Sequence, residues 1–183
     1  MSTHDLDKYQ QRVFKHITKK IIKNEKLAFD DVLLQPQYSL IKSRSDIDLS
    51  NNLDSNIKLK IPIISSPMDT VTEAPMARQM HELGGLGIIH RYNSIEEQAA
   101  MVRSVAAAGA SNVAAAIGVT SDFEERSCAL YDAGARILCV DIAHGHHVLM
   151  ERALKILKDI YGKSVHLMAG NVATLEGFND LAD

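Results

Sequence analysis

Residues 84–118 read GGLGIIHRYNSIEEQAAMVRSVAAAGASNVAAAIG. The stretch holds two short apolar runs, residues 86–89 and 113–117, and a helix-like segment between them that begins at Ser94 and ends before Gly109. Apolar runs of four or five residues without polar alternation are typical of strands buried on both faces of a parallel sheet. The stretch therefore predicts a strand, a helix and a second, parallel strand.

The same unit recurs on both sides of this stretch. Four glycines, at positions 84, 109, 134 and 162, follow the expected helices at spacings of 25, 25 and 28 residues. Glycine suits the left-handed residue that ends a helix. Five βα units are visible, with strands expected at residues 61–65, 86–89, 113–117, 137–140 and 165–168, and with helices expected at 73–83, from 94, from 121, at 148–161 and from 174.

Two of the expected helices begin with a capping-box pattern. Ser94 is followed by Glu97, and Ser121 is followed by Glu124. In such a box the serine side chain accepts from the backbone three residues on, while the glutamate side chain accepts from the serine backbone. We expect both serines to be N-cap residues.

An open doubly wound sheet and a closed eight-stranded barrel both use this pattern. Polar residues follow nearly every expected strand, among them Ser66, His90, Asp141 and Asn171. A barrel gathers all of its strand ends around one mouth, whereas a doubly wound sheet uses those near its switch point. The pattern favours the barrel, an α/β parallel (β/α)8 fold of which about five units are present.

The composition is that of a soluble globular domain, with 46% apolar and 23% charged residues among 183. The net charge of −3 gives no general attraction to nucleic acid. Two cysteines outside any C-x-x-C pair predict a reducing, cytoplasmic setting. We find no apolar run of membrane-spanning length and no secretory signal. An apolar stripe over residues 1–22 predicts a helical extension, placed at 1–26, before the barrel portion at 27–183.

Several motifs at the ends of the expected strands could belong to a functional site, and each also has a purely structural explanation. Residues 65–70 (SSPMDT) form either a ligand-facing turn or a simple helix cap. The glycines of residues 84–87 precede a strand rather than follow one, so close backbone packing explains them better than a nucleotide fingerprint. The histidines of residues 141–147 (DIAHGHH) lack a carboxylate or thiol at ligand spacing, and we expect no metal. Cys128 and Cys139 are expected to be buried structural thiols.

Together these motifs resemble one family, the IMP dehydrogenase/GMP reductase family. The resemblance runs from about residue 26 to residue 183 and is carried, in order, by LAFDDVLL (27–34), IPIISSPMDTVTEA (61–74), GGLGIIH (84–90), DIAHGH (141–146) and AGNVAT (169–174). It implies a barrel enzyme of purine metabolism that moves hydride between C2 of a purine nucleotide and NADPH or NAD, after a cysteine attacks C2. It also implies a homotetramer and, in full-length members, a monovalent cation.

The resemblance assigns roles residue by residue. Ser66 and Met68 match positions that line the pocket for the purine nucleotide, GMP or IMP. Asp141, with Ile142 and Ala143, matches the part that meets the nicotinamide riboside. Asn171 matches a residue beside both the purine and the nicotinamide, and His90 with Arg91 matches the approach to the cofactor's distal half.

The two branches of the family are mixed in this chain. SSPMDTVTEA and NSIEEQ (93–98) look like the dehydrogenase, whereas KSRS (42–45), DIAHGH and MAGN (168–171) look like the reductase. The regulatory insert that most dehydrogenases carry after the second helix is absent, since only residues 106–112 separate that helix from the next strand. We favour GMP reductase and keep IMP dehydrogenase as the alternative.

The family's cysteine nucleophile belongs to a loop after the sixth strand, and no residue of this chain matches it. We expect no catalytic residue among the 183 and no turnover by these residues alone. Two readings follow: a portion of a complete oxidoreductase, or a truncated, non-catalytic relative that acts as a binding partner.

Overall fold

The computed structural model describes residues 27–182. The chain divides into a unit that ends at Ile47 and a compact unit that begins at Asp48. Within the first unit the described residues form two short 3-10 helices, Phe29–Asp31 and Arg44–Asp46. The helix predicted over residues 1–22 lies outside the described residues.

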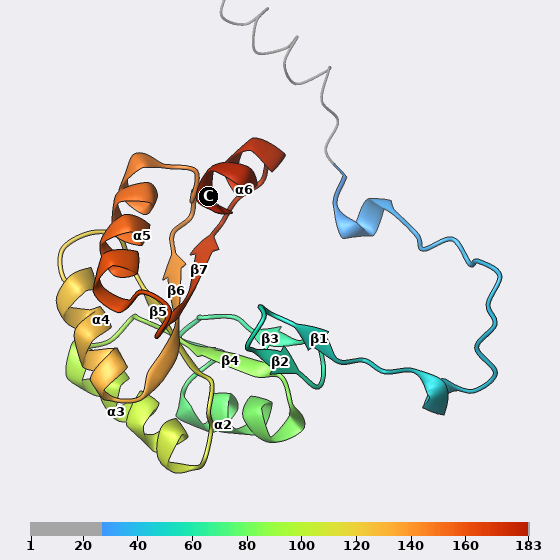
Figure 1. Cartoon of the computed structure of the whole chain (residues 1–183), viewed down its shortest axis with the longest axis horizontal. Coiled ribbons are helices and arrows are strands. Elements are labelled where there is room, and N and C mark those ends of the chain that lie inside the picture. Colours follow the sequence, from blue (N-terminus) through green and yellow to red (C-terminus); the bar gives the residue numbers. More distant parts are fainter. Residues whose placement is uncertain (1–26, 183) are drawn as a thin grey trace, which may run out of the picture. The chain divides into compact units, whose positions relative to one another are not determined.

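The compact unit alternates strands and helices as the sequence predicts (Figure 1). A small antiparallel pair comes first, and a five-stranded sheet in the order β3-β4-β5-β6-β7 follows, with every neighbouring pair parallel. The elements are β1 (Asn51–Asn52), β2 (Lys58–Leu59), β3 (Ile64–Ser65), α2 (Ala74–Leu83), β4 (Leu86–Ile89), α3 (Ile95–Ala107), β5 (Val113–Ile117), α4 (Phe123–Asp132), β6 (Ala135–Asp141), α5 (Val148–Tyr161), β7 (His166–Gly170) and α6 (Leu175–Ala182).

The strands β4 and β5 in the sheet are buried along their whole length, which explains their unbroken apolar runs. In β5 the side chains of Ala115 and Ile117 face the helices, while Ala114 and Ala116 face the opposite side. The outer cluster joins strand residues to residues of α2, α3, α4 and α5. The inner cluster contains strand residues and, from the β1–β2 hairpin, Ile57 and Leu59.

Helices on one face and a hairpin on the other distinguish a barrel from a doubly wound sheet, which has helices on both faces. Figure 1 shows α2 to α5 along the outer side of a curved sheet and the β1–β2 hairpin on its other side. The predicted class, a partial parallel α/β barrel, is confirmed.

The glycine prediction for residues 84–87 is also confirmed. A Cβ on Gly85 would lie 2.7 Å from the Ile63 carbonyl oxygen, and a Cβ on Gly87 would lie 2.6 Å from the Cα of Ala77 in α2. Both distances are far below ordinary van der Waals contact. Glycine at these positions lets the chain and α2 approach β4 closely.

One of the two capping boxes forms and the other does not. The Ser94 side chain accepts from Glu97 N at 3.1 Å, and Glu97 Oε2 accepts from Ser94 N at 3.0 Å. The box predicted at Ser121 is wrong: Ser121 has a φ of 57°, Asp122 is the N-cap residue, and its side chain makes no capping bond. The Asp122 carboxylate binds the Arg126 guanidinium instead of a backbone N–H of the first turn.

Candidate functional site

Parallel strands place their carboxyl ends at one edge of the sheet, and every residue predicted for the site lies just after, or at, such an end. Ser66 follows β3, His90 follows β4, Asp141 closes β6 and Asn171 follows β7. The neighbouring ends of β6 and β7 are in register, with Asp141 opposite Gly170. The sheet therefore brings residues from positions 66 to 171 to the mouth of the half-barrel.

The buried side chain of Thr72 stabilises the loop between β3 and α2. This side chain is fully buried, and its hydroxyl donates to the Ser66 carbonyl at 2.7 Å and lies 2.9 Å from Ser65 Oγ. The Met68 carbonyl accepts from the backbone of residues 71 and 72. Ser66 and Met68 remain exposed, so their side chains are free to meet a ligand.

His90 is buried, with 3% of its surface exposed. Its Nδ1 accepts from Tyr92 N at 3.1 Å, so the ring proton of the neutral form is on Nε2. That nitrogen lies 3.6 Å from Glu73 Oε1, and the His90 backbone donates to the Thr72 carbonyl at 3.2 Å. His90 thus joins the β3–α2 loop to the β4–α3 loop from inside.

Arg91 reaches across the end of β5. Its Nη2 donates to the carbonyl of Asp141 at 3.3 Å, and its Nη1 lies 3.3 Å from where a Cβ of Gly118 would be. The guanidinium also lies 5.5 Å from the centroid of the Tyr92 ring. Gly118 leaves room for the guanidinium, so three strand ends meet through one side chain.

The loop after β6 is tied to the start of the segment after β7. Ile142 N donates to the Gly170 carbonyl at 2.9 Å, and Asn171 N donates to the Ile142 carbonyl at 2.8 Å. Gly145 N donates to the Asn171 carbonyl at 2.6 Å, and a Cβ on Gly145 would lie 2.9 Å from that oxygen. Asp141 and Ile142 are half-buried here, whereas Ala143 and Asn171 are exposed.

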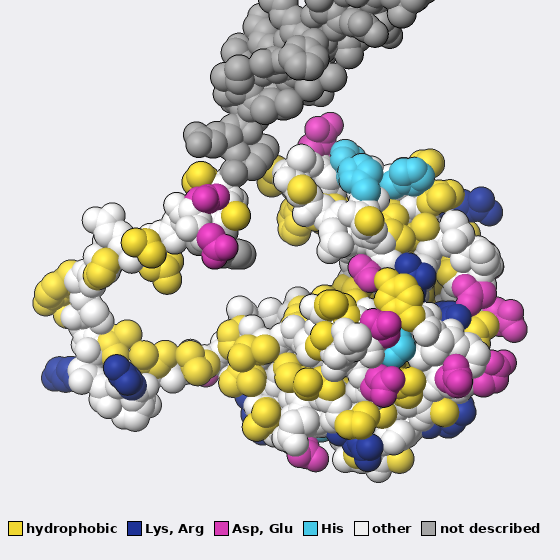
Figure 2. Space-filling model, turned by 180° about the vertical axis from the view of Figure 1, so that it is seen from behind, with side chains coloured by type: hydrophobic (Ala, Val, Ile, Leu, Met, Phe, Trp, Pro, Cys, Tyr) yellow, Lys and Arg dark blue, Asp and Glu magenta, His cyan; other side chains and the backbone are white. Residues whose placement is uncertain are grey.

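The histidines of the β6–α5 loop have separate local partners. His146 Nε2 lies 2.8 Å from Asp180 Oδ2 in α6, and the His147 side chain accepts from Leu149 N at the start of α5. Figure 2 shows one group of histidine side chains on the surface and a further histidine patch apart from it. Within residues 27–182 no three histidine, cysteine or acidic side chains are close enough to hold a metal ion.

The two thiols differ, and one prediction about them is wrong. Cys139 is partly buried in β6, and burial, with a smaller effect of Asp141, raises its pKa to about 12. Cys128 is exposed on α4 rather than buried, because this helix turns Phe123 and Leu130 into the outer cluster and leaves Cys128 outside it. Tyr161 Oη lies 3.6 Å from its sulfur.

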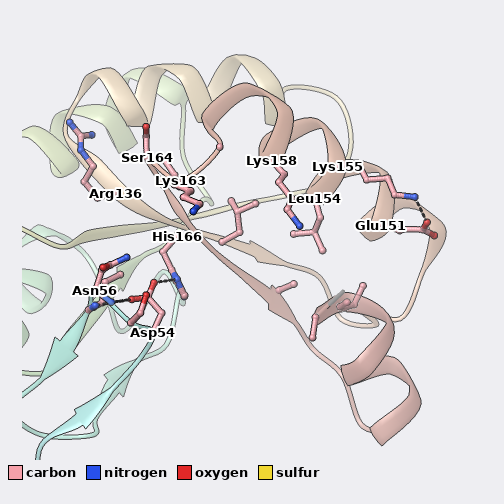
Figure 3. Close-up of a pocket in the computed structure, with 18 of the residues that line it drawn as sticks. Asp54, Asn56, Arg136, Glu151, Leu154, Lys155, Lys158, Lys163, Ser164 and His166 are labelled. Atoms are coloured by element: carbon pink, nitrogen blue, oxygen red, sulfur yellow. Dashed lines mark hydrogen bonds and ion pairs between the residues drawn. The ribbon is translucent and has the colours of Figure 1, made fainter.

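A cavity of about 850 Å³ lies away from the mouth, among the β1–β2 hairpin, β7, α5 and α6 (Figure 3). Asp54 of the hairpin points to His166 at the start of β7, with Oδ2 and Nδ1 2.6 Å apart. On α5, Lys155 pairs with Glu151 at 2.6 Å. None of the described residues predicted for the site lines this cavity, so it is distinct from the mouth.

Comparison with known proteins decides the family. The model of the IMP dehydrogenase / GMP reductase domain matches residues 26–183. The chain belongs to this family. The predicted resemblance is confirmed over the barrel portion, including the first described residues that precede the sheet.

Relatives of both names are similar to this chain. An IMP dehydrogenase of Cryptosporidium parvum is 34% identical over 199 aligned positions, which cover 86% of this chain and 48% of that protein. An IMP dehydrogenase of Nitrosopumilus maritimus is 49% identical over 98 residues, covering 54% of this chain and 21% of that protein. A GMP reductase of Leishmania donovani is 56% identical over 81 residues, covering 44% and 16%. The chain spans about half or less of the length of these relatives.

In the helices of residues 27–182 we find none whose length and apolar character would suit a bilayer crossing.

Proposed function

We propose that this chain is part of a purine nucleotide oxidoreductase that uses a nicotinamide cofactor, and that its reaction is the reduction of GMP by NADPH to IMP and ammonia. The observation that carries the proposal is the family match over residues 26–183 together with the polar side chains at the mouth. Hydride transfer is the chemistry that the cofactor supplies when it is bound.

The residues at the mouth fit the two ligands. Among the described residues, no protein group hydrogen-bonds the carboxylate of Asp141 or the carboxamide of Asn171. A free carboxylate is suited to accept from ribose hydroxyls, and a free carboxamide can both donate to and accept from a purine or a nicotinamide amide. Asp141 is proposed to hold the nicotinamide riboside, with Ile142 and Ala143 beside it, and Asn171 to lie between the two rings.

The exposed residues of the β3–α2 loop are proposed for the purine nucleotide. Ser66 can hydrogen-bond the nucleotide, and Met68, with 49% of its surface exposed, can cover an apolar ring face. His90 and Arg91 are proposed to lie where the cofactor's distal half approaches, with Arg91 held by the Asp141 carbonyl and His90 close to Glu73.

IMP dehydrogenase is the second candidate, favoured by relatives of that name that align over most of this chain. Both reactions use a purine nucleotide and a nicotinamide cofactor, but hydride moves in opposite directions between them. The reductase motifs DIAHGH and MAGN lie in β6, β7 and the loops after them, whereas the dehydrogenase motif SSPMDTVTEA spans β3 and its loop.

Binding is the direct test, because neither thiol of the chain is suited to attack C2: burial keeps Cys139 protonated and Cys128 lies on the outer helix layer. NADPH and NAD are titrated into the purified 183-residue chain, with and without GMP or IMP, and binding is measured by isothermal titration calorimetry. We expect saturable binding that Asp141→Ala weakens at least tenfold. Tighter binding of NADPH with GMP supports the reductase, and tighter binding of NAD with IMP supports the dehydrogenase. Absence of binding to all four ligands would refute the proposal and leave the non-catalytic binding partner.

A further inference from the structure

A buried polar network connects the loops that follow β4 and β5. Arg126, on α4, is 8% exposed, and Gln98, on α3, is fully buried. The Arg126 Nη1 donates to Gln98 Oε1 at 2.8 Å. Long polar side chains are seldom buried unless they are paired. Hydrogen bonds must therefore offset the free-energy cost of burying Arg126 and Gln98.

The side-chain amide nitrogen of Gln98 donates to backbone carbonyls at the ends of two strands. Its Nε2 donates to the carbonyl of Ala116, near the end of β5, at 2.8 Å and to the carbonyl of Ile89, the last residue of β4, at 3.4 Å. One carboxamide therefore bridges the carboxyl ends of adjacent strands.

Arg126 binds the two loops that leave these strands. Its Nη2 donates to the backbone carbonyl of Asn93, in the β4–α3 loop, at 3.2 Å. Its Nη2 and Nε both donate to Asp122 Oδ2, at the end of the β5–α4 loop, at 2.6 and 2.9 Å. The rigid fork of a guanidinium can satisfy three acceptors in one plane, which an ammonium cannot do with the same geometry.

These two loops carry groups at the mouth. The β4–α3 loop holds Arg91, whose guanidinium lies over Gly118 at the start of the β5–α4 loop and reaches Asp141. A shift of either loop would move Arg91 relative to the Asp141 carbonyl. The contacts of Arg126 are thus two residues from Arg91 on one loop and four from Gly118 on the other.

We propose that Arg126, acting through Gln98, Asp122 and the Asn93 carbonyl, is a positioning residue that fixes the β4–α3 and β5–α4 loops for binding of the nicotinamide cofactor. The cofactor part of this inference rests on the function proposed above. The part of the inference that concerns how the two loops are held rests only on the hydrogen bonds described above.

The test compares Arg126→Met with a matched change on the same helix. Ser127 is also fully buried on α4, but its hydroxyl lies 2.9 Å from Tyr161 Oη and faces α5 rather than the mouth. Ser127→Ala therefore removes a buried hydrogen bond of α4 without touching either loop. Amide hydrogen exchange of residues 90–93 and 118–122 is measured for both variants, at denaturant concentrations that equalise their overall stability.

We expect Arg126→Met to raise exchange in both loops at least tenfold and to weaken NADPH or NAD binding about tenfold, with Ser127→Ala leaving both unchanged. Arg126→Lys should restore little, since lysine lacks the fork. The proposal would be overturned if the two loops of Arg126→Met exchanged their amide hydrogens at the wild-type rate. It would also be overturned if exchange rose equally in Ser127→Ala. If the wild-type chain binds neither cofactor, the proposed function fails, while the exchange comparison still decides whether Arg126 fastens the loops.

Discussion

Replacing Gly87 by alanine tests whether close packing of α2 on β4 is the reason for the glycine. The new Cβ would lie 2.6 Å from Ala77 Cα and 3.1 Å from Ala77 Cβ. Carbon atoms in contact prefer about 3.5–4.0 Å, so α2 must move by roughly 1 Å. Ala77 Cα is backbone and cannot rotate away, and the strain therefore falls on the whole helix.

Strain of this kind costs about 1–3 kcal/mol, and the entropy of the unfolded chain returns about 0.4–1 kcal/mol when alanine replaces glycine. We expect a net loss of about 1–2 kcal/mol in the free energy of unfolding, measured by urea denaturation followed by circular dichroism. The matched control is Gly118→Ala, whose Cβ meets only the flexible end of Arg91 at 3.3 Å. A Gly87→Ala variant as stable as the wild type, or one no less stable than the control, would contradict the packing argument.

Three further predictions concern the site and the hairpin. At pH 8 a thiol reagent should modify Cys128 quickly and leave Cys139 unmodified, because burial raises the Cys139 pKa to about 12; mass spectrometry that finds Cys139 labelled in the folded chain refutes this. Asp141→Asn should weaken binding of the nicotinamide cofactor severalfold in calorimetric titration with no loss of stability, and equal binding would count against its role. The backbone hydrogen bond from Asn56 is the first cause that lowers the Asp54 pKa, so Asp54 adds stability above its ordinary pKa that is lost as pH falls through the lowered value. Asp54→Ala should remove about 1 kcal/mol at pH 7 and less at pH 3 in urea titrations, and a cost independent of pH would be the contrary result.

Periodicity alone predicted the fold well because a parallel sheet buried on both faces leaves a strong record in the sequence. The strand at 113–117 and the helix at 148–161 have the predicted bounds, and β4 matches residue for residue. Each of these elements is bounded by a glycine or by a residue that starts a helix. Such signals are local and do not depend on the rest of the chain.

The predictions of a capping box at Ser121 and of a buried Cys128 were wrong. Both depend on which hydrogen-bond partner, or which face of a helix, a side chain takes in the folded chain. Ser121 followed by Glu124 has the pattern of a capping box, yet the N-cap residue is Asp122, whose carboxylate binds Arg126. Cys128 is followed by apolar residues in the sequence, but the turn of α4 directs it outward. Both outcomes are decided by which partner lies opposite in space.

The residues at the mouth were predictable by their place at strand ends, and their local partners were not. Nothing in the sequence pairs Arg91 with the carbonyl of Asp141 fifty residues later, or Thr72 with the Ser66 carbonyl. The Arg126 network was missed because a lone arginine in a polar helical stretch has the pattern of an exposed residue. A buried glutamine and an arginine 28 positions apart become recognisable as partners only in three dimensions.

The contact between Asp54 Oδ2 and His166 Nδ1 joins residues 112 positions apart, one before the first βα unit and one in the fifth. During synthesis the β1–β2 hairpin leaves the ribosome long before β7 does. Its apolar residues Ile57 and Leu59 can settle against the inner side of the sheet only as that sheet is assembled. The contact between Asp54 and His166 can therefore form only after β7 has been synthesised, so the hairpin lacks this partner until the fifth βα unit is present.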